Sequence, residues 1–340
     1  MSVLLPPEVL APEIASVGAL ALPWFNAAPT SLQALRGSVV CVDFWDYTCV
    51  NCIRTLPYLR LWHDRYAAHG LTILGVHAPE FPFAHEQRNV ERGIAEFDLR
   101  YPIVLDNDYA IWRAFENQYW PAKYLIDAHG YLRYAHFGEG AYQATEVAIQ
   151  TLLQQRDPAF TPPSVLSPLR ETDGSGAVCY RVTPELYCGY RRGRLGNTEG
   201  FRADAEQRFV ATAAREEGRL YVDGIWQCGP ESLTFRSPQG DSVAGSLRVS
   251  YRAVEVNLVL HPGTNGGALE VWQDDAPLAA DVAGADVAIT AGQARVAVTT
   301  PRMYALIKNP TYGEHTLELR TTTPGLAAYA FTFVSCCVQS

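Results

Sequence analysis

The sequence predicts an α/β domain with a mixed sheet, followed by an all-β jelly-roll sandwich domain. Three observations lead to this prediction: alternating strand-like and helix-like stretches in the first half, a proline-rich segment after them, and short alternating segments beyond it. A chain of 340 residues is also longer than one core usually fills, so two domains are expected. We place them at residues 1–157 and 170–340, with a linker at 158–169.

The first half alternates the two kinds of element. Runs rich in Val, Ile and aromatic residues predict strands at 38–45, 71–78, 101–106 and on both sides of the turn at His129-Gly130. Apolar residues at steps of three and four predict helices at 49–69, 85–99, 109–115 and 144–155. A strand-helix-strand opening followed by a hairpin implies a mixed sheet with helices on both faces.

The second half reads as an antiparallel sandwich. Its clearest segments alternate apolar and polar residues between Gly, Pro and Asn, and lie at 251–260, 266–274, 285–290, 293–300, 302–309, 315–322 and 327–334. Before them stands an arginine cluster of Arg191, Arg192 and Arg194. We interpret it as a solvated connecting segment, with an anion clamp as the alternative.

Composition excludes some classes of partner. With 48% hydrophobic and 19% charged residues the chain has the make-up of a globular protein, and its net charge of -9 argues against nucleic acid and anionic lipid. No apolar run is long enough to span a membrane, and residues 1–16 lack a basic export signal. As written, the chain is therefore expected to be cytoplasmic, or periplasmic or extracytoplasmic if its N-terminus is truncated.

The pair Cys49 and Cys52 has the spacing of a redox couple. It follows a buried strand and opens a predicted helix, where unsatisfied N–H groups and the macrodipole favour negative charge. The Cys49 thiolate should therefore attack a disulfide, and Cys52, one turn later, should resolve the mixed disulfide. We expect Cys49 to be partly exposed and Cys52 to be more buried.

Zinc binding and peroxide reduction are two other uses of cysteines. A zinc site needs two more ligands at suitable spacing, and the remaining cysteines lie far away or, like Cys41, in a buried strand. A thiol peroxidase would need a single reactive cysteine. We therefore expect no metal and no cofactor besides the cysteine pair, and favour dithiol exchange.

The motifs around this pair resemble a known family. VDFWDYTCVNC with the following Pro57 is similar to the thioredoxin superfamily active site, and WPAKYLID at 120–127 to its second signature, in which a cis-proline precedes a strand. FWDYTCVNCIRTLPYL, HAPEF and YWPAKYLID together resemble the extracytoplasmic part of the DipZ family, a relative of TlpA-like proteins. The resemblance implies an N-terminal hairpin at 22–40 and a carbohydrate-binding-module-like sandwich after the linker.

The resemblance also implies roles for site residues. Cys49 and Cys52 match the attacking and resolving thiols, and Pro121 matches the cis-proline. Asp43 matches a buried acid that exchanges a proton with the resolving thiol, and burial in a strand should raise its pKa. The alternative for Asp43 is a hydrogen-bonded acid of structural purpose.

Three further residues are weaker candidates. Glu80 in HAPEF is a possible acid-base group, or it caps the helix that follows. Trp45 and Trp120 are expected to flank the dithiol as apolar walls, with ordinary core positions as the alternative. Pro57 lies within the predicted helix and should kink it.

The sequence thus predicts a thiol-disulfide oxidoreductase of protein disulfides, served by an electron-donor protein, with the sandwich domain binding substrate or partner. Reduction or exchange is favoured over oxidation, but the Val50-Asn51 pair does not give the direction. The alternative is a glycan- or protein-binding module with a regulatory dithiol.

The second half holds further thiols and tryptophans. Cys179 and Cys188 are expected to be buried free thiols, although they could bridge in an oxidising space. Strand alternation should point Cys336 and Cys337 to opposite faces, one of them in the core. Trp226 and Trp272 are expected in the core, with stacking on a bound glycan as the alternative.

Overall fold

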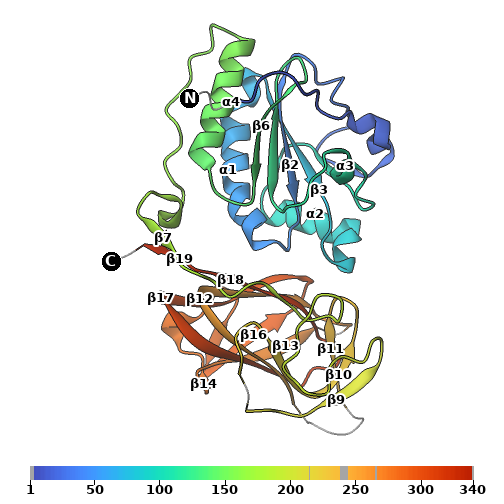
Figure 1. Cartoon of the computed structure of the whole chain (residues 1–340), viewed down its shortest axis with the longest axis vertical. Helices are drawn as coiled ribbons and strands as arrows, with labels where there is room; N and C mark the ends of the chain where they lie inside the picture. Colours follow the sequence, from blue (N-terminus) through green and yellow to red (C-terminus); the bar gives the residue numbers. More distant parts are fainter. Residues whose placement is uncertain (1–3, 214, 238–243, 265, 339–340) are drawn as a thin grey trace. The chain divides into compact units, whose positions relative to one another are not determined.

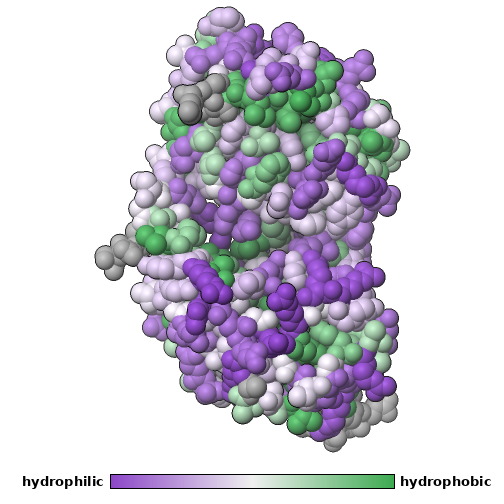
Figure 2. Space-filling model, in the orientation of Figure 1, coloured by the Kyte–Doolittle hydropathy of each residue, from purple (hydrophilic) through white to green (hydrophobic). Residues whose placement is uncertain are grey.

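The protein consists of two compact units, Met1–Asp173 and Gly174–Ser340. The computed structural model describes residues 4–213, 215–237, 244–264 and 266–338 (Figure 1). Figure 2 shows hydrophilic and hydrophobic residues interspersed over the face that it displays. Within the described part of the chain, no helix has the length and apolar character needed to cross a membrane.

The first unit is built on a six-stranded mixed sheet, as predicted. Its strands lie in the order β1 (Trp24–Phe25), β4 (Ile103–Leu105), β3 (Leu71–His77), β2 (Val39–Trp45), β5 (Ala122–Ile126) and β6 (Leu132–Phe137). The pairs β2/β3 and β3/β4 are parallel, whereas β2/β5 and β5/β6 are antiparallel. Strand β2 therefore lies in the interior of the sheet, and it carries the chain directly to the cysteine pair.

Helices cover both faces of this sheet. They are α1 (Val50–Tyr66), α2 (Gln87–Glu96), α3 (Ala110–Ala114) and α4 (Tyr142–Arg156), and Figure 1 shows α1 and α4 on one side and α3 on the other. Helix α1 runs through Pro57 and continues as a 3-10 turn, Ala67–His69. It ends at Gly70, whose φ of 93° is a conformation that glycine adopts without strain.

The predicted N-terminal hairpin at 22–40 is wrong. Strand β1 pairs with β4, with Trp24 opposite Val104 and Phe25 opposite Ile103, and the chain before it forms the 3-10 helices Ile14–Val17 and Ala19–Ala21. The reason is that β3 leaves one edge of β4 free, and β1 hydrogen-bonds to that edge instead of to a neighbour in sequence.

The proline-rich segment 158–169 packs on the first unit. The Glu146 carboxylate on α4 accepts a hydrogen bond from the Leu166 N–H at 2.8 Å, and the Gln150 amide donates to the Pro163 carbonyl at 2.9 Å. The Tyr58 hydroxyl accepts from the Leu169 N–H at 2.8 Å. These bonds hold the segment along α1 and α4, and the division between the units follows Asp173.

The second unit is all-β, as predicted. Its strands are β7 (Ala177–Cys179), β8 (Leu186–Tyr187), β9 (Glu206–Phe209), β10 (Leu220–Cys228), β11 (Leu233–Arg236), β12 (Gly245–His261), β13 (Gly267–Gln273), β14 (Ala276–Pro277), β15 (Ala288–Thr290), β16 (Gln293–Val298), β17 (Arg302–Thr321), β18 (Ala327–Val334) and β19 (Cys336–Val338). The two segments expected at 302–309 and 315–322 form the single long strand β17. Strand β17 pairs with β12, and β12 also pairs with β18. The buried apolar side chains of the unit form one large core.

The two tryptophans of this unit differ in burial, and its arginine cluster is exposed. Trp226 lies in the core as expected, but Trp272 is half-buried under the Arg320 guanidinium, which lies 3.9 Å from the ring centroid. In the arginine cluster, Arg191 and Arg192 form ion pairs with Glu231, and all three arginines are exposed, in agreement with a solvated segment.

The expectation for Cys179 was wrong, while that for Cys188 is confirmed. Cys188 is a buried free thiol, but Cys179 forms a disulfide with Cys336. Neither Cys336 nor Cys337 is a core residue, since both are half-buried. The pairing depends on the register of β7 with β19, two strands 157 residues apart in sequence, which local patterns do not encode.

Candidate active site

Cys49 is the N-cap residue of α1. Its backbone is extended, with φ -83° and ψ 117°, and its Sγ accepts a hydrogen bond from the Cys52 N–H at 3.3 Å. A thiolate at this position receives an otherwise unsatisfied helix N–H and lies in the positive field of the helix end. Cys49 is half-buried and Cys52 is 1% exposed, which confirms the predicted difference in accessibility.

The loop before Cys49 is fixed by Asp46, which sequence reasoning missed. One carboxylate oxygen of this buried residue accepts from the Thr48 N–H and hydroxyl, both at 2.6 Å. The other accepts from the Glu80 N–H at 2.7 Å, and the Asp46 carbonyl accepts from the Cys49 N–H at 3.2 Å. Burial raises the pKa of Asp46, while these hydrogen bonds oppose the rise. Asp46 therefore ties the start of α1 to the loop after β3.

Asp43 lies at the centre of the sheet. It pairs in register with Gly75 on β3 and with Lys123 on β5, and it is fully buried. Neither of its carboxyl oxygens has a hydrogen-bond partner among the described residues, so the alternative of a hydrogen-bonded structural acid is not found. Burial raises the pKa of Asp43 to about 7, against the opposing charge of Lys123.

Lys123 is a second site residue that the sequence analysis missed. It is fully buried, burial lowers its pKa, and the charge of Asp43 opposes that effect. Its Nζ donates to the Gly138 carbonyl at 3.4 Å. The available signal was a lysine inside an otherwise apolar strand, since such a charge is rarely buried without a partner.

The Cys52 thiol shares the buried surroundings of Asp43. Burial, the hydrogen bond with Cys49 and nearby negative charge, including that of Asp43, raise the pKa of Cys52 well above its usual range. Burial and the nearby charges of Asp43 and Cys41 raise the pKa of Tyr101. The buried hydroxyl of Tyr101 has no hydrogen-bond partner among the described residues. A Cβ on Gly75 would come within 3.2 Å of the Tyr101 ring, so the glycine makes room for this packing.

Residues Trp120 and Pro121 of the second predicted signature lie in the loop that leads into β5. The Trp120-Pro121 peptide bond is cis, which confirms the prediction, and the Pro121 carbonyl accepts from the Gly138 N–H at 2.8 Å. Trp120 is half-buried, its indole N–H donates to the Ala78 carbonyl at 3.0 Å, and its ring lies 4.3 Å from that of Trp112. The Trp120 indole is thereby held against the loop that follows β3.

The two remaining predicted site residues are Trp45 and Glu80. Trp45 is fully buried, and its ring meets His77 edge-on at 5.2 Å. Glu80 does not cap the helix that follows, because the N-cap of the 3-10 helix Pro82–His85 is Phe81. The backbone N–H of Glu80 is instead one of the groups that bind Asp46.

His77 was not singled out from the sequence. It is fully buried at the end of β3, stacks on Tyr47 with ring centroids 5.7 Å apart, and places Nε2 4.0 Å from the Asp46 carboxylate. Burial lowers the pKa of His77 to about 3, so its ring is neutral near neutral pH. It acts as a neutral packing group beneath the loop that carries the dithiol.

The fold and the site together define a class of protein. A mixed sheet with helices on both faces carries two free cysteines at a helix N-terminus beside a cis-proline loop and a buried acid. No group of three or more possible metal ligands occurs within the described ranges. The arrangement is that of a thioredoxin-like thiol-disulfide oxidoreductase.

Comparison with known proteins agrees with this class. Residues 17–135 match the AhpC/TSA family, and residues 183–333 match the family described as thioredoxin like C-terminal domain. Each match covers less than half of the chain, the first within residues 1–173 and the second within residues 174–340.

Individual relatives cover the chain to different extents. Protein DipZ of Mycobacterium tuberculosis is 32% identical over 315 residues, which are 91% of this chain and 41% of the relative, so the chain spans less than half of that protein. Thiol-disulfide oxidoreductase YkuV of Bacillus subtilis is 28% identical over 39% of this chain and 90% of its own length. A solved thioredoxin-like protein in the oxidised form is 27% identical, covers 46% of this chain and 99% of its own, and gives a TM-score of 0.38.

Proposed function

We propose that the protein exchanges electrons with protein disulfides through Cys49 and Cys52. The observation that carries this proposal is the position of Cys49, half-exposed at the N-cap of α1 with the Cys52 N–H directed at its sulfur. In the first step the Cys49 thiolate attacks one sulfur of a substrate disulfide. That S–S bond breaks, a mixed disulfide forms, and the leaving sulfur takes up a proton.

The second step needs a base. Cys52 is buried and its pKa is raised, so it must lose its proton as it attacks the Cys49 sulfur of the mixed disulfide. Asp43, with a pKa of about 7, is matched to accept that proton near neutral pH. The products are the Cys49–Cys52 disulfide and the fully reduced substrate, and an electron-donor protein would restore the dithiol.

The surrounding residues support this assignment. Because Pro121 has no N–H, it leaves the edge of its extended segment open to a substrate strand near the sulfur. We propose Trp120 as an apolar wall of this region, and Trp45 as a buried support beneath it. Glu80 contributes through its backbone bond to Asp46, and we assign no proton transfer to its side chain.

The second unit is proposed to bind the protein substrate or partner. The support is that the resemblance to DipZ extends over 91% of the chain and therefore includes both units. Two units that occur together in a relative are expected to serve one reaction.

Turnover of a model substrate tests the proposal. The full chain should catalyse reduction of insulin disulfides by dithiothreitol, and Cys49→Ser and Cys52→Ser should each reduce the rate to the uncatalysed level. Cys188→Ser is the matched control, because this thiol is buried in the other unit. Equal rates for Cys49→Ser and the unaltered protein would refute the proposal.

A further inference from the structure

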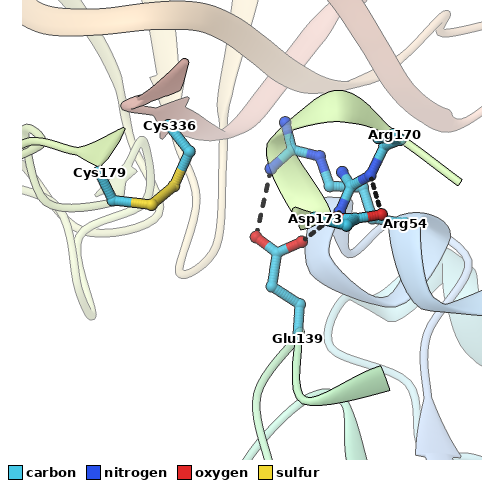
Figure 3. The surroundings of a disulfide bond; sticks show 6 residues. All are labelled: Arg54, Glu139, Arg170, Asp173, Cys179 and Cys336. Carbon is cyan, nitrogen blue, oxygen red and sulfur yellow. Dashed lines mark hydrogen bonds and ion pairs between the residues drawn. A yellow bond between two sulfur atoms is a disulfide. The ribbon is translucent and has the colours of Figure 1, made fainter. Parts of the chain in front are cut away.

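The second unit contains a disulfide outside its large apolar core. Strands β7 and β19 form a two-stranded sheet of their own, joined by three residue pairs, in which Cys179 lies directly opposite Cys336 (Figure 3). Their Cα atoms are 4.0 Å apart. Cys179 is exposed and Cys336 is half-buried, so the Cys179 sulfur is the more accessible to an attacking thiolate. We call this pair of strands with its disulfide the clasp.

The disulfide is a main determinant of the clasp. A two-stranded ribbon is marginally stable by itself in water, and this one has three residue pairs within the part of the chain that the structure describes. The chain just after it is fixed independently, since Tyr180 stacks on Tyr312 at 4.6 Å and the Tyr312 hydroxyl donates to the Arg181 carbonyl at 2.6 Å. Opening the disulfide should therefore release residues 174–179 and 336–338 and leave the sandwich core intact.

We propose that the clasp is a second redox centre, opened by the Cys49–Cys52 dithiol; the proposal rests on the function given above. The Cys49 thiolate attacks the Cys179 sulfur, and Cys336 leaves as a thiolate that takes up a proton. Cys52 then loses its proton, attacks Cys49 and frees Cys179 as a thiol. Two electrons and two protons pass from the dithiol to the clasp, which ends as two thiols.

Opening the clasp would change the connection between the two units. The first unit holds the chain as far as Asp173, whose carboxylate accepts a hydrogen bond from Arg170 at 2.5 Å (Figure 3). The same carboxylate accepts a hydrogen bond from the Tyr58 hydroxyl at 2.7 Å. Residues 174–179 follow directly and end in the clasp. Released, these residues span up to about 20 Å when extended. The redox state of the dithiol would thus set the length of free chain between the units.

The test compares rates of clasp opening. All proteins carry Cys337→Ser, because this half-buried free thiol lies within the clasp next to Cys336 and could exchange with its disulfide. Protein with an oxidised clasp is mixed with limiting dithiothreitol and quenched with iodoacetamide, and mass spectrometry gives the alkylated fraction of Cys179 and Cys336. Opening should be at least about tenfold faster with the dithiol than in the Cys49→Ser/Cys52→Ser variant, where only the small reagent attacks.

Hydrogen exchange reports the structural consequence. Amides of 177–179 should lose protection when the clasp opens, whereas the Cys188 N–H, bonded to the Tyr329 carbonyl at 2.7 Å, should keep it. Equal opening rates with and without the dithiol would overturn the proposal. So would a Cys179→Ser/Cys336→Ser variant whose second unit no longer folds, because the disulfide would then be structural.

The insulin assay separates the two failures. If the unaltered chain does not reduce insulin, the proposed function itself fails. Suppose instead that insulin is reduced both by the unaltered chain and by the folded Cys179→Ser/Cys336→Ser variant. If the clasp then opens equally fast with and without the dithiol, only the proposal of a second redox centre is refuted.

Discussion

Asp43 on β2 and Lys123 on β5 are directly paired across the centre of the sheet, and both side chains are fully buried. Burial raises the pKa of the acid and lowers that of the base, and each charge partly offsets the effect on the other. The charge of Asp43 also raises the pKa of the buried Cys52 thiol, and the proposed mechanism assigns to Asp43 the proton that Cys52 must lose.

Replacing Asp43 should slow the resolving step and spare the first attack. In Asp43→Asn, the rate of Cys52 attack on the Cys49 mixed disulfide should fall about 100-fold near pH 7, the usual range for loss of a general base. Rapid-quench measurement of the mixed disulfide should show it accumulating. Asp98→Asn, which changes a half-exposed acid, is the control and should behave like the unaltered protein. Unchanged resolution in Asp43→Asn would remove the acid from the mechanism.

Replacing Lys123 should shift the pH midpoint of the resolving step to a higher pH. The charge of Lys123 lowers the pKa of Asp43, so Lys123→Met should raise that pKa above about 7. The resolving rate should then reach half of its plateau at a higher pH. A pH-rate profile measures this midpoint, and a midpoint that stays or falls would contradict the assigned coupling.

Asp43 should also make the first unit less stable at high pH. Its pKa is about 7 when folded and about 3.9 in an unfolded chain, so the native state binds more protons between these values. Stability therefore falls as pH rises from about 4 to 7 and levels off above that range. Asp43→Asn should lack this fall and be more stable than the unaltered protein at pH 8, by a few kcal/mol, in urea unfolding. A difference independent of pH would refute the shift.

His77 should make the folded protein less stable at low pH, which is the opposite of the effect of Asp43. Its pKa is lowered to about 3 in the folded protein, whereas an unfolded histidine titrates near about 6.5. As pH falls between these values only the unfolded chain gains a proton, so stability is lost. His77→Phe should flatten this acid-side loss in urea unfolding at pH 4 and 7. The exposed His129→Gln serves as control, and equal slopes in all three proteins would exclude His77 as the cause.

Local patterns were enough to predict much of the fold and the reacting thiols. The buried run of β2 and the helical periodicity after Cys49 placed the dithiol at a helix N-terminus, because these features depend on neighbours in sequence. The cis-proline at Pro121 was expected from the resemblance of residues 120–127 to the second thioredoxin signature.

Features that depend on pairing between distant segments were missed. The register of β5 with β2 places Lys123 opposite Asp43. The register of β7 with β19 places Cys179 opposite Cys336. The expected hairpin failed for the same reason, since Trp24 joins the distant strand β4. Asp46 was overlooked because its partner, the Glu80 N–H, lies 34 residues away in sequence.

The central claim is that Cys49 attacks and Cys52 resolves. The most direct measurement is mass spectrometry of mixed disulfides formed when reduced Cys52→Ser and Cys49→Ser variants of the full chain meet oxidised insulin. The account predicts a stable adduct on Cys49 in Cys52→Ser and none in Cys49→Ser, because Cys52 is buried. An adduct on Cys52, or none on Cys49, would contradict it.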